Sequence, residues 1–182
     1  MFKLSALFAV LSGPVLAAGL VIEVAGEQSK GTVTIDLFEQ IAPQHVERLT
    51  TLARAGAYDD VVFHRVIEGF MAQTGDVEFG KAGGNISMAG RGGSELPDLP
   101  AEFSDTPYDR GVIGMARAQN PNSANSQFFI MFAEGYFLNG QYTVVGKVID
   151  GMDVLDAIKL GKGANGVVLG IPDRMSKVTV TD

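Results

Sequence analysis

The sequence predicts a single, mainly β domain: a β-barrel whose open ends are covered by helices. Glycine is abundant, with 23 residues in a chain of 182, and this frequency indicates many turns between short elements. Several short segments are rich in β-branched and aromatic residues and are bounded by turn-forming residues, which is the pattern of strands. Only two segments have the apolar spacing of a helix. The chain shows no repeat or linker, and its length suffices for one complete hydrophobic core.

The first half of the chain is predicted to form two strands and then a helix. Leu20–Val24 and Thr32–Phe38 are expected strands, and in the second of them apolar and polar residues alternate, as in a half-buried strand. Pro43 is expected to open the helix, because its fixed φ suits the first helical position. Gly56 is expected to close the helix, because glycine readily adopts the left-handed conformation of a C-terminal cap.

The rest of the chain is predicted to return to β structure. Val61–Gln73 is expected to form two short strands hinged at Gly69, and Gly75–Pro100 a loop over the body, because it is rich in Gly, Ser, Pro and Asp. A short helix is expected at Met152–Lys159, ended by Gly161. The remaining expected strands are Gly111–Ala116, Gln127–Phe132, Thr143–Ile149 and Lys177–Thr181.

The N-terminus has the pattern of a cleaved signal peptide. A lysine precedes the apolar run Leu4–Leu11, and small residues lead to an expected cleavage site after Ala17. A first strand or an uncleaved membrane anchor is the alternative. A spanning helix needs about 20 apolar residues, however, and Gly13–Pro14 interrupts this run. We therefore expect a signal peptide at residues 1–17 and one domain at residues 18–182, without membrane attachment after cleavage.

Composition argues against several classes of function. The formal net charge is −7, whereas nucleic acids and anionic membrane surfaces attract basic patches. The absence of cysteine excludes disulfides and thiolate zinc sites, and makes the chain indifferent to an oxidising compartment. With only two histidines, His45 and His64, a site of several histidine ligands for a metal is also excluded.

Two glycine-rich segments imitate nucleotide-binding motifs. Gly75–Ala82 nearly matches a P-loop, but Ala82 lacks the hydroxyl that binds magnesium. Gly161–Gly166 matches a dinucleotide-binding pattern but follows a helix, whereas that pattern requires a preceding strand. We therefore expect no nucleotide, no metal and no other cofactor.

Two motifs combine amide or cationic side chains with aromatic residues. Phe63–Asp76 places Arg65 and Gln73 among apolar residues, where a lone cation can bind and polarise an uncharged group. Ser123–Phe132 places Gln127 next to two phenylalanines. At strand spacing, Gln127 and the second phenylalanine share one face, so the latter can face a groove while the first packs inward.

These two motifs, together with Gly140–Val148, resemble the cyclophilin family of peptidyl-prolyl cis-trans isomerases, from about Leu20 to the C-terminus. The resemblance implies a closed eight-stranded antiparallel β-barrel capped by two helices. It also implies catalytic roles for Arg65, Gln73 and Phe129. The substrate-binding residues that it implies are Phe70, Met71, Ala116, Arg117, Gln127, Phe137, Leu138 and Tyr142.

Three of these positions depart from the best-known eukaryotic cyclophilins. Arg117 replaces asparagine, Phe137 replaces tryptophan, and Tyr142 replaces histidine. We expect the Arg117 contact to survive, because it is made largely through the backbone. Similar replacements are familiar in bacterial cyclophilins, and together with the expected signal peptide they favour a periplasmic location.

The implied reaction suits these residues. Rotation about a peptide bond has a barrier of about 18–20 kcal/mol, because amide resonance must be lost. A donor such as Arg65, aimed at the prolyl nitrogen, stabilises the twisted state more than either planar state. Gln73 can hold the carbonyl before proline, and Phe129 belongs to the apolar pocket for the ring. Since the reaction needs no proton transfer, we interpret His64 as structural.

The leading interpretation is an exported prolyl isomerase that acts as a monomer on proline-containing, unfolded or flexible polypeptides. One alternative is a non-catalytic chaperone module that binds proline-containing segments on the same fold. The presence of Arg65 argues against it, because binding alone does not require that cation. A second alternative, a scaffold subunit of a larger assembly, has no supporting sequence feature.

Cyclosporin is expected to bind more weakly than it binds family members with tryptophan at position 137. Phe137 offers an apolar face but no indole donor, and a buried acceptor left unpaired costs about 1–3 kcal/mol, or roughly 10- to 100-fold in affinity. Phe137→Trp should strengthen inhibition and spare peptide turnover, which inhibitor titration and a turnover assay can measure together. Unchanged inhibition would shift attention to Arg117 or Tyr142.

Overall fold

The computed structural model describes residues 18–181 of the chain. The expected signal peptide therefore lies outside the described residues. The strands are β1 (Gly19–Ala25), β2 (Lys30–Leu37), β3 (Val61–Val62), β4 (Arg65–Ile67), β5 (Met71–Thr74), β6 (Val112–Met115), β7 (Phe128–Met131), β8 (Val144–Asp150) and β9 (Arg174–Thr181). The helices are α1 (Pro43–Arg54) and α2 (Met152–Asp156), with two short 3₁₀ turns, η1 (Ile86–Met88) and η2 (Tyr136–Leu138). None of the helices described is long and apolar enough to cross a membrane.

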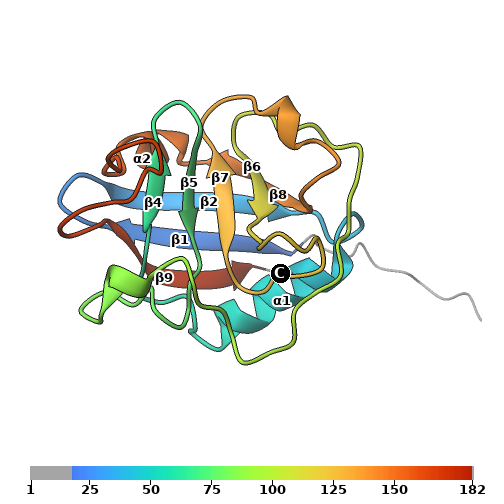
Figure 1. Ribbon diagram of the computed structural model, residues 1–182, viewed down its shortest axis with the longest axis horizontal. Helices are drawn as coiled ribbons and strands as arrows, with labels where there is room; N and C mark the ends of the chain where they lie inside the picture. The colour runs from blue at the N-terminus through green and yellow to red at the C-terminus, as the bar shows by residue number, and fades with distance from the viewer. Residues whose placement is uncertain (1–17, 182) are drawn as a thin grey trace, which may run out of the picture.

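The described strands form one antiparallel sheet in the order β3-β9-β1-β2-β8-β6-β7-β5-β4. The sheet curls on itself, so that β4, β5, β7 and β6 cross in front of β1, β2 and β9 (Figure 1). Helix α1 packs beside β9, and α2 packs near β2 towards the opposite end of the sheet. The prediction of a mainly β domain with two helices is confirmed.

The prediction of a closed eight-stranded barrel was wrong, because the ladder has nine strands and is open between β3 and β4. These two strands are consecutive in the chain, and the backbone changes partner between them. Phe63 N donates to Asp173 O (2.9 Å), and His64 O accepts from Val168 N (3.0 Å). One continuous segment, 61–67, therefore forms both edges of the sheet, and the peptide chain itself joins them.

Most expected elements are present, and the differences lie at their ends. Helix α1 begins at Pro43 and is followed by Gly56 in the left-handed conformation (φ +68°), as predicted. Helix α2 ends at Asp156, before the expected Lys159. Strand β9 starts at Arg174, earlier than expected, because this residue pairs with both β1 and β3. Such pairing partners cannot be read from a local pattern.

Strand β7 divides the interior into two apolar clusters. Phe128 and Ile130 point into the main core between the sheet and the helices, whereas Phe129 and Met131 point into a smaller cluster on the other face. This alternation follows from the two-residue period of a strand. It confirms that Phe128 packs inward while Phe129 faces a different surface.

A buried carboxylate holds the long loop between β5 and β6 against the sheet. Asp76 is fully buried, and its Oδ2 accepts hydrogen bonds from Gly90 N (2.7 Å) and Gly92 N (3.0 Å). Its Oδ1 accepts from Phe79 N (2.9 Å). Because a buried carboxylate must be compensated by donors, the loop backbone is fixed at the point where it passes the site described below.

Candidate active site

The register of four neighbouring strands brings the predicted catalytic residues into one lateral row. Arg65 of β4 lies opposite Gln73 of β5, and Gln73 lies opposite Phe129 of β7. Phe129 in turn lies opposite Gly114 of β6. Since directly paired residues project from the same face of a sheet, three side chains from separate strands converge on one surface.

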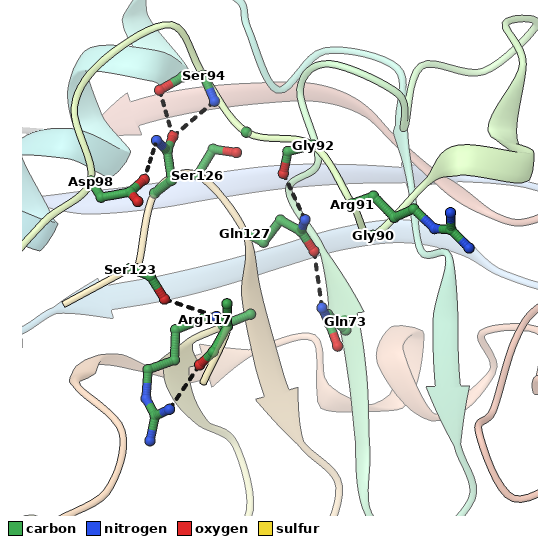
Figure 2. A pocket seen from close by; sticks show the side chains of 14 residues that line it. Gln73, Gly90, Arg91, Gly92, Ser94, Asp98, Arg117, Ser123, Ser126 and Gln127 are labelled. Carbon is green, nitrogen blue, oxygen red and sulfur yellow. Dashed lines mark hydrogen bonds between the residues drawn. The ribbon is translucent and has the colours of Figure 1, made fainter. Parts of the chain in front are cut away.

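A chain of hydrogen bonds orients the polar side chains of this row. Arg65 Nη1 donates to Gln73 Oε1 (3.2 Å), and Gln73 Nε2 donates to Gln127 Oε1 (2.9 Å). Gln127 Nε2 donates to the backbone oxygen of Gly92 (2.8 Å) in the loop fixed by Asp76. Figure 2 shows the last two contacts in line. An amide nitrogen has two hydrogens, so Gln73 can still donate to a ligand.

The row opens into a cavity of about 300 Å³. All the predicted site residues line it except Gln127, which lies next to it and is connected through Gln73. The residues lining the cavity are Arg65, Phe70, Met71, Gln73, Ala116, Arg117, Phe129, Phe137, Leu138 and Tyr142. The sequence prediction thus named a set that the fold brings together.

The aromatic floor of the cavity depends on two residues that the sequence analysis did not single out. The Phe129 ring stacks on Tyr108 (centroids 5.7 Å apart) and meets Tyr142 edge-on. A Cβ at Gly114 would lie only 2.4 Å from Phe129 Cζ and 2.4 Å from the Tyr108 hydroxyl oxygen. Glycine inside a strand often marks such a close approach, so the Gly111–Ala116 pattern contained a signal for this position.

The three positions that depart from eukaryotic relatives all line the cavity, at different points of its wall. The Arg117 guanidinium lies over the Tyr142 ring (4.4 Å) and donates to Gln141 O (2.8 Å). In Figure 2 its guanidinium extends away from Gln127 and Gly92, and the residue can meet a ligand through its backbone. Phe137 is 66% exposed at the rim and packs against Phe70, so it extends the apolar wall.

Two cations line the cavity, Arg65 and Arg117, and backbone oxygens accept hydrogen bonds from the guanidinium of Arg117. Partial burial lowers the pKa of Arg65 from the ordinary value, yet an arginine stays protonated at physiological pH. Burial also lowers the pKa of neighbouring His64 to about 4, although the Asp76 carboxylate opposes the shift; Arg65 reinforces it. His64 is therefore neutral at pH 7, in keeping with a structural role. Among residues 18–181 no cluster of His, Asp and Glu is placed to hold a metal ion.

Comparison with known proteins identifies the family. The model of the cyclophilin type peptidyl-prolyl cis-trans isomerase/CLD family matches residues 21–180. The chain belongs to the cyclophilin family. It is 58% identical over 152 residues to a probable peptidyl-prolyl cis-trans isomerase of Brucella suis, covering 82% of this chain and 78% of that protein.

The fold of this cyclophilin agrees with solved structures. The crystal structure of a cyclophilin type isomerase from Cryptosporidium parvum matches with a TM-score of 0.75 and 26% identity, over 92% of this chain and 99% of that one. A second structure of the same protein, in the presence of the dipeptide Ala-Pro, matches with a TM-score of 0.74 and 26% identity, over 90% of this chain and 99% of that one. The protein is thus a cyclophilin-type peptidyl-prolyl cis-trans isomerase, and its cavity lies among the residues at which the family resemblance predicted the active site.

Gly114→Ala should impair catalysis by displacing the Phe129 ring. The added methyl meets two buried aromatic groups, and overpacking of this kind costs about 1–3 kcal/mol of stability. Tyr108→Phe alone removes a hydroxyl that has no hydrogen-bond partner among the described residues, so we expect little loss. The double variant should recover part of the kcat/KM of Gly114→Ala. Peptide turnover and urea unfolding of all three variants test this; equal kcat/KM for Gly114→Ala and wild type would contradict it.

Stability should fall in mild acid, whereas kcat/KM should stay flat from about pH 6 to 9. The folded pKa of His64, about 4, lies below its ordinary 6.5, so the unfolded chain binds the proton first and stability is lost as pH falls from 6.5 towards 4. His64→Gln should remove about 1–2 kcal/mol of the difference in unfolding free energy between pH 7 and pH 5. A bell-shaped kcat/KM profile near pH 6.5 would instead assign His64 a catalytic role.

Proposed function

We propose that Arg65, Gln73 and Phe129 carry the isomerase reaction, and that the enzyme accelerates the folding of exported proteins. The observation on which the first part depends is the lateral row of the sheet. It places a fixed cation beside the aromatic and aliphatic walls of a cavity of about 300 Å³. Such a cavity can hold a proline ring, and the cation can stabilise the neutral prolyl nitrogen as the amide twists.

The apolar part of the site accounts for proline. Phe129 is 6% exposed and Met71 1% exposed, so both form a firm floor. Phe70, Leu138 and Phe137 complete the walls of the same cavity. Binding there removes the apolar surface of the prolyl ring from water. This burial stabilises the complex in proportion to the apolar area covered. The structure of the Cryptosporidium parvum relative in the presence of Ala-Pro supports this class of ligand.

Arg65 stabilises the transition state more than it stabilises the bound substrate. Its Nε donates to Asn165 O (2.9 Å), and its Nη1 donates to Gln73. No described residue accepts a hydrogen bond from Nη2. As the amide twists, the prolyl nitrogen gains a lone pair, and Nη2 can donate to it at that stage. Because the guanidinium is already oriented, little reorganisation accompanies the donation.

Gln73 and the backbone at Arg117 hold the chain on either side of the twisting bond. Gln73 lines the cavity, and the second hydrogen of its Nε2 can bind the carbonyl before proline. The Arg117 side chain is occupied by Gln141 O and by the oxygens of Ala118 and Gln119. Its backbone therefore offers the contact, and rotation can proceed while one side of the bond stays fixed.

The role in export is supported by sequence. The N-terminal pattern of a basic residue, an apolar run and small residues is typical of export signals. A chain without cysteine also suits an oxidising compartment. Isomerisation of X-Pro bonds is slow enough to limit the rate of folding. An isomerase that acts on newly exported polypeptides would therefore accelerate their folding.

Arg65→Ala should lower kcat/KM on a short X-Pro peptide by about 100-fold, the size expected for one preorganised donor. The fold should persist, since Arg65 is a partly exposed strand residue outside both apolar clusters. Arg65→Lys serves as the matched control, because it keeps the charge but loses the rigid fork and should recover only part of the rate. Near wild-type turnover by Arg65→Ala, with an unchanged circular dichroism spectrum, would exclude the mechanism.

The mature exported chain should begin at Ala18, or at Gly19 if cleavage shifts by one residue. Expression of the full chain in an exporting bacterial host, followed by intact-mass measurement of the recovered protein, checks this. A species that retains Met1 and sediments with membranes would favour an uncleaved anchor.

A further inference from the structure

A second cavity adjoins the proline pocket and continues it. Its volume is about 610 Å³, and it shares Arg65 and Gln73 with that pocket. The loop around Ile86–Arg91 lines one side, and His64 is among the residues between the two sides. The other side is lined by segment 167–172 without Ile171, that is by Val167, Val168, Leu169, Gly170 and Pro172. We call this cavity the flanking groove. Because Arg65 and Gln73 line both cavities, the flanking groove borders the first cavity directly.

The 167–172 side of the flanking groove presents apolar side chains to solvent. Val167 is 50% exposed and Leu169 is 57% exposed, whereas Val168 between them is 7% exposed. This alternation is held in place, because Val168 N donates to His64 O (3.0 Å) and Val167 bridges to Arg65. A fixed apolar surface beside a catalytic pocket is a feature of ligand-binding grooves.

The opposite side carries a cation. Arg91 is exposed, and no hydrogen bond or ion pair joins its guanidinium to another residue in the described part of the chain. In Figure 2 its side chain extends away from Gln127. Between the two sides lies His64, 8% exposed and neutral, and neither ring nitrogen has a well-placed hydrogen-bond partner among the described residues.

We propose that the flanking groove binds the segment of the client polypeptide adjacent to the X-Pro bond. It favours an apolar residue against Val167 and Leu169 and an acidic residue within reach of Arg91. The inference rests on the proposed function, since Arg65 and Gln73 line both cavities. Successive residues of an extended chain are about 3.4 Å apart, so residues only a few positions from proline reach the groove.

The apolar preference can be tested with Leu169→Ser. The matched control is Ile171→Ser, because Ile171 lies on the same segment and is 66% exposed but does not line the groove. Three substrates are compared: a blocked tetrapeptide centred on Ala-Pro, the same core extended by four residues on each side with leucines, and that peptide with serines in their place. Versions extended on one side only identify the side that binds.

The wild-type enzyme should favour the leucine-containing peptide over the serine-containing peptide by about 5- to 10-fold in kcat/KM, the effect of burying part of one apolar side chain. Leu169→Ser should abolish that preference and leave turnover of the tetrapeptide unchanged. Ile171→Ser should behave as wild type. Circular dichroism verifies that each variant is folded.

The charge preference is tested with an extended peptide carrying aspartate or asparagine near proline. The wild type should favour aspartate about 2- to 5-fold at low salt, less at high salt. Arg91→Ala should lose this preference, and Arg91→Lys should retain most of it.

The outcomes separate the two proposals. If the wild type turns over the tetrapeptide but treats all extended peptides alike, the groove proposal fails and the proposed function stands. The groove proposal also fails if Ile171→Ser and Leu169→Ser lose the preference equally. If the wild type turns over no peptide at all, the proposed function fails, and the groove proposal fails with it.

Discussion

The site depends on the register of β4, β5, β7 and β6. A slip of one residue in any of these pairings would turn Arg65 or Phe129 away from the cavity and bring a core residue to the surface. The register is secured from the opposite face, where Val66, Ala72 and Phe128 all belong to the main core. Burial of these apolar neighbours therefore fixes the direction of a cation that is itself only half-buried.

The second constraint is the loop between β5 and β6. Asp76 binds the backbone at Gly90 and Gly92, and the Gly92 oxygen accepts the last hydrogen bond of the chain that begins at Arg65. The loop also forms one side of the flanking groove. A single buried carboxylate thus sets the position of a segment that lines the flanking groove and is hydrogen-bonded, through Gln127, to Gln73 at the first cavity.

Local patterns predicted much of this architecture. Proline at the start of α1, glycine after its end and alternation in β2 each act within a few residues, so their consequences were readable. The sidedness of Phe128 and Phe129 followed from strand period alone. The Arg65–Gln73–Phe129 set came from resemblance to a family, since no local rule predicts that β5 pairs with β7.

What could not be predicted depends on contacts between distant segments. The change of partner between Phe63 and His64 is set by β9 and by the 166–168 segment, which lie about 100 residues further along the chain. Tyr108 lies in a loop without periodicity, and its stacking on Phe129 follows from how that loop packs. The sequence around Val167 and Leu169 has no clear helical or strand periodicity, so the exposure of these two side chains could not be predicted from it.

The partner change in segment 61–67 has a consequence for how this protein coexists with its clients. Under the proposed function the enzyme meets unfolded chains, and an open sheet edge would offer them a strand for pairing and aggregation. Here both terminal strands are covered. In β3, Val62 N donates to Gly80 O (2.8 Å), and in β4, Val66 N donates to Gly166 O (2.7 Å). The sheet can therefore expose its active-site face to unfolded polypeptides while leaving few backbone groups free to pair with them.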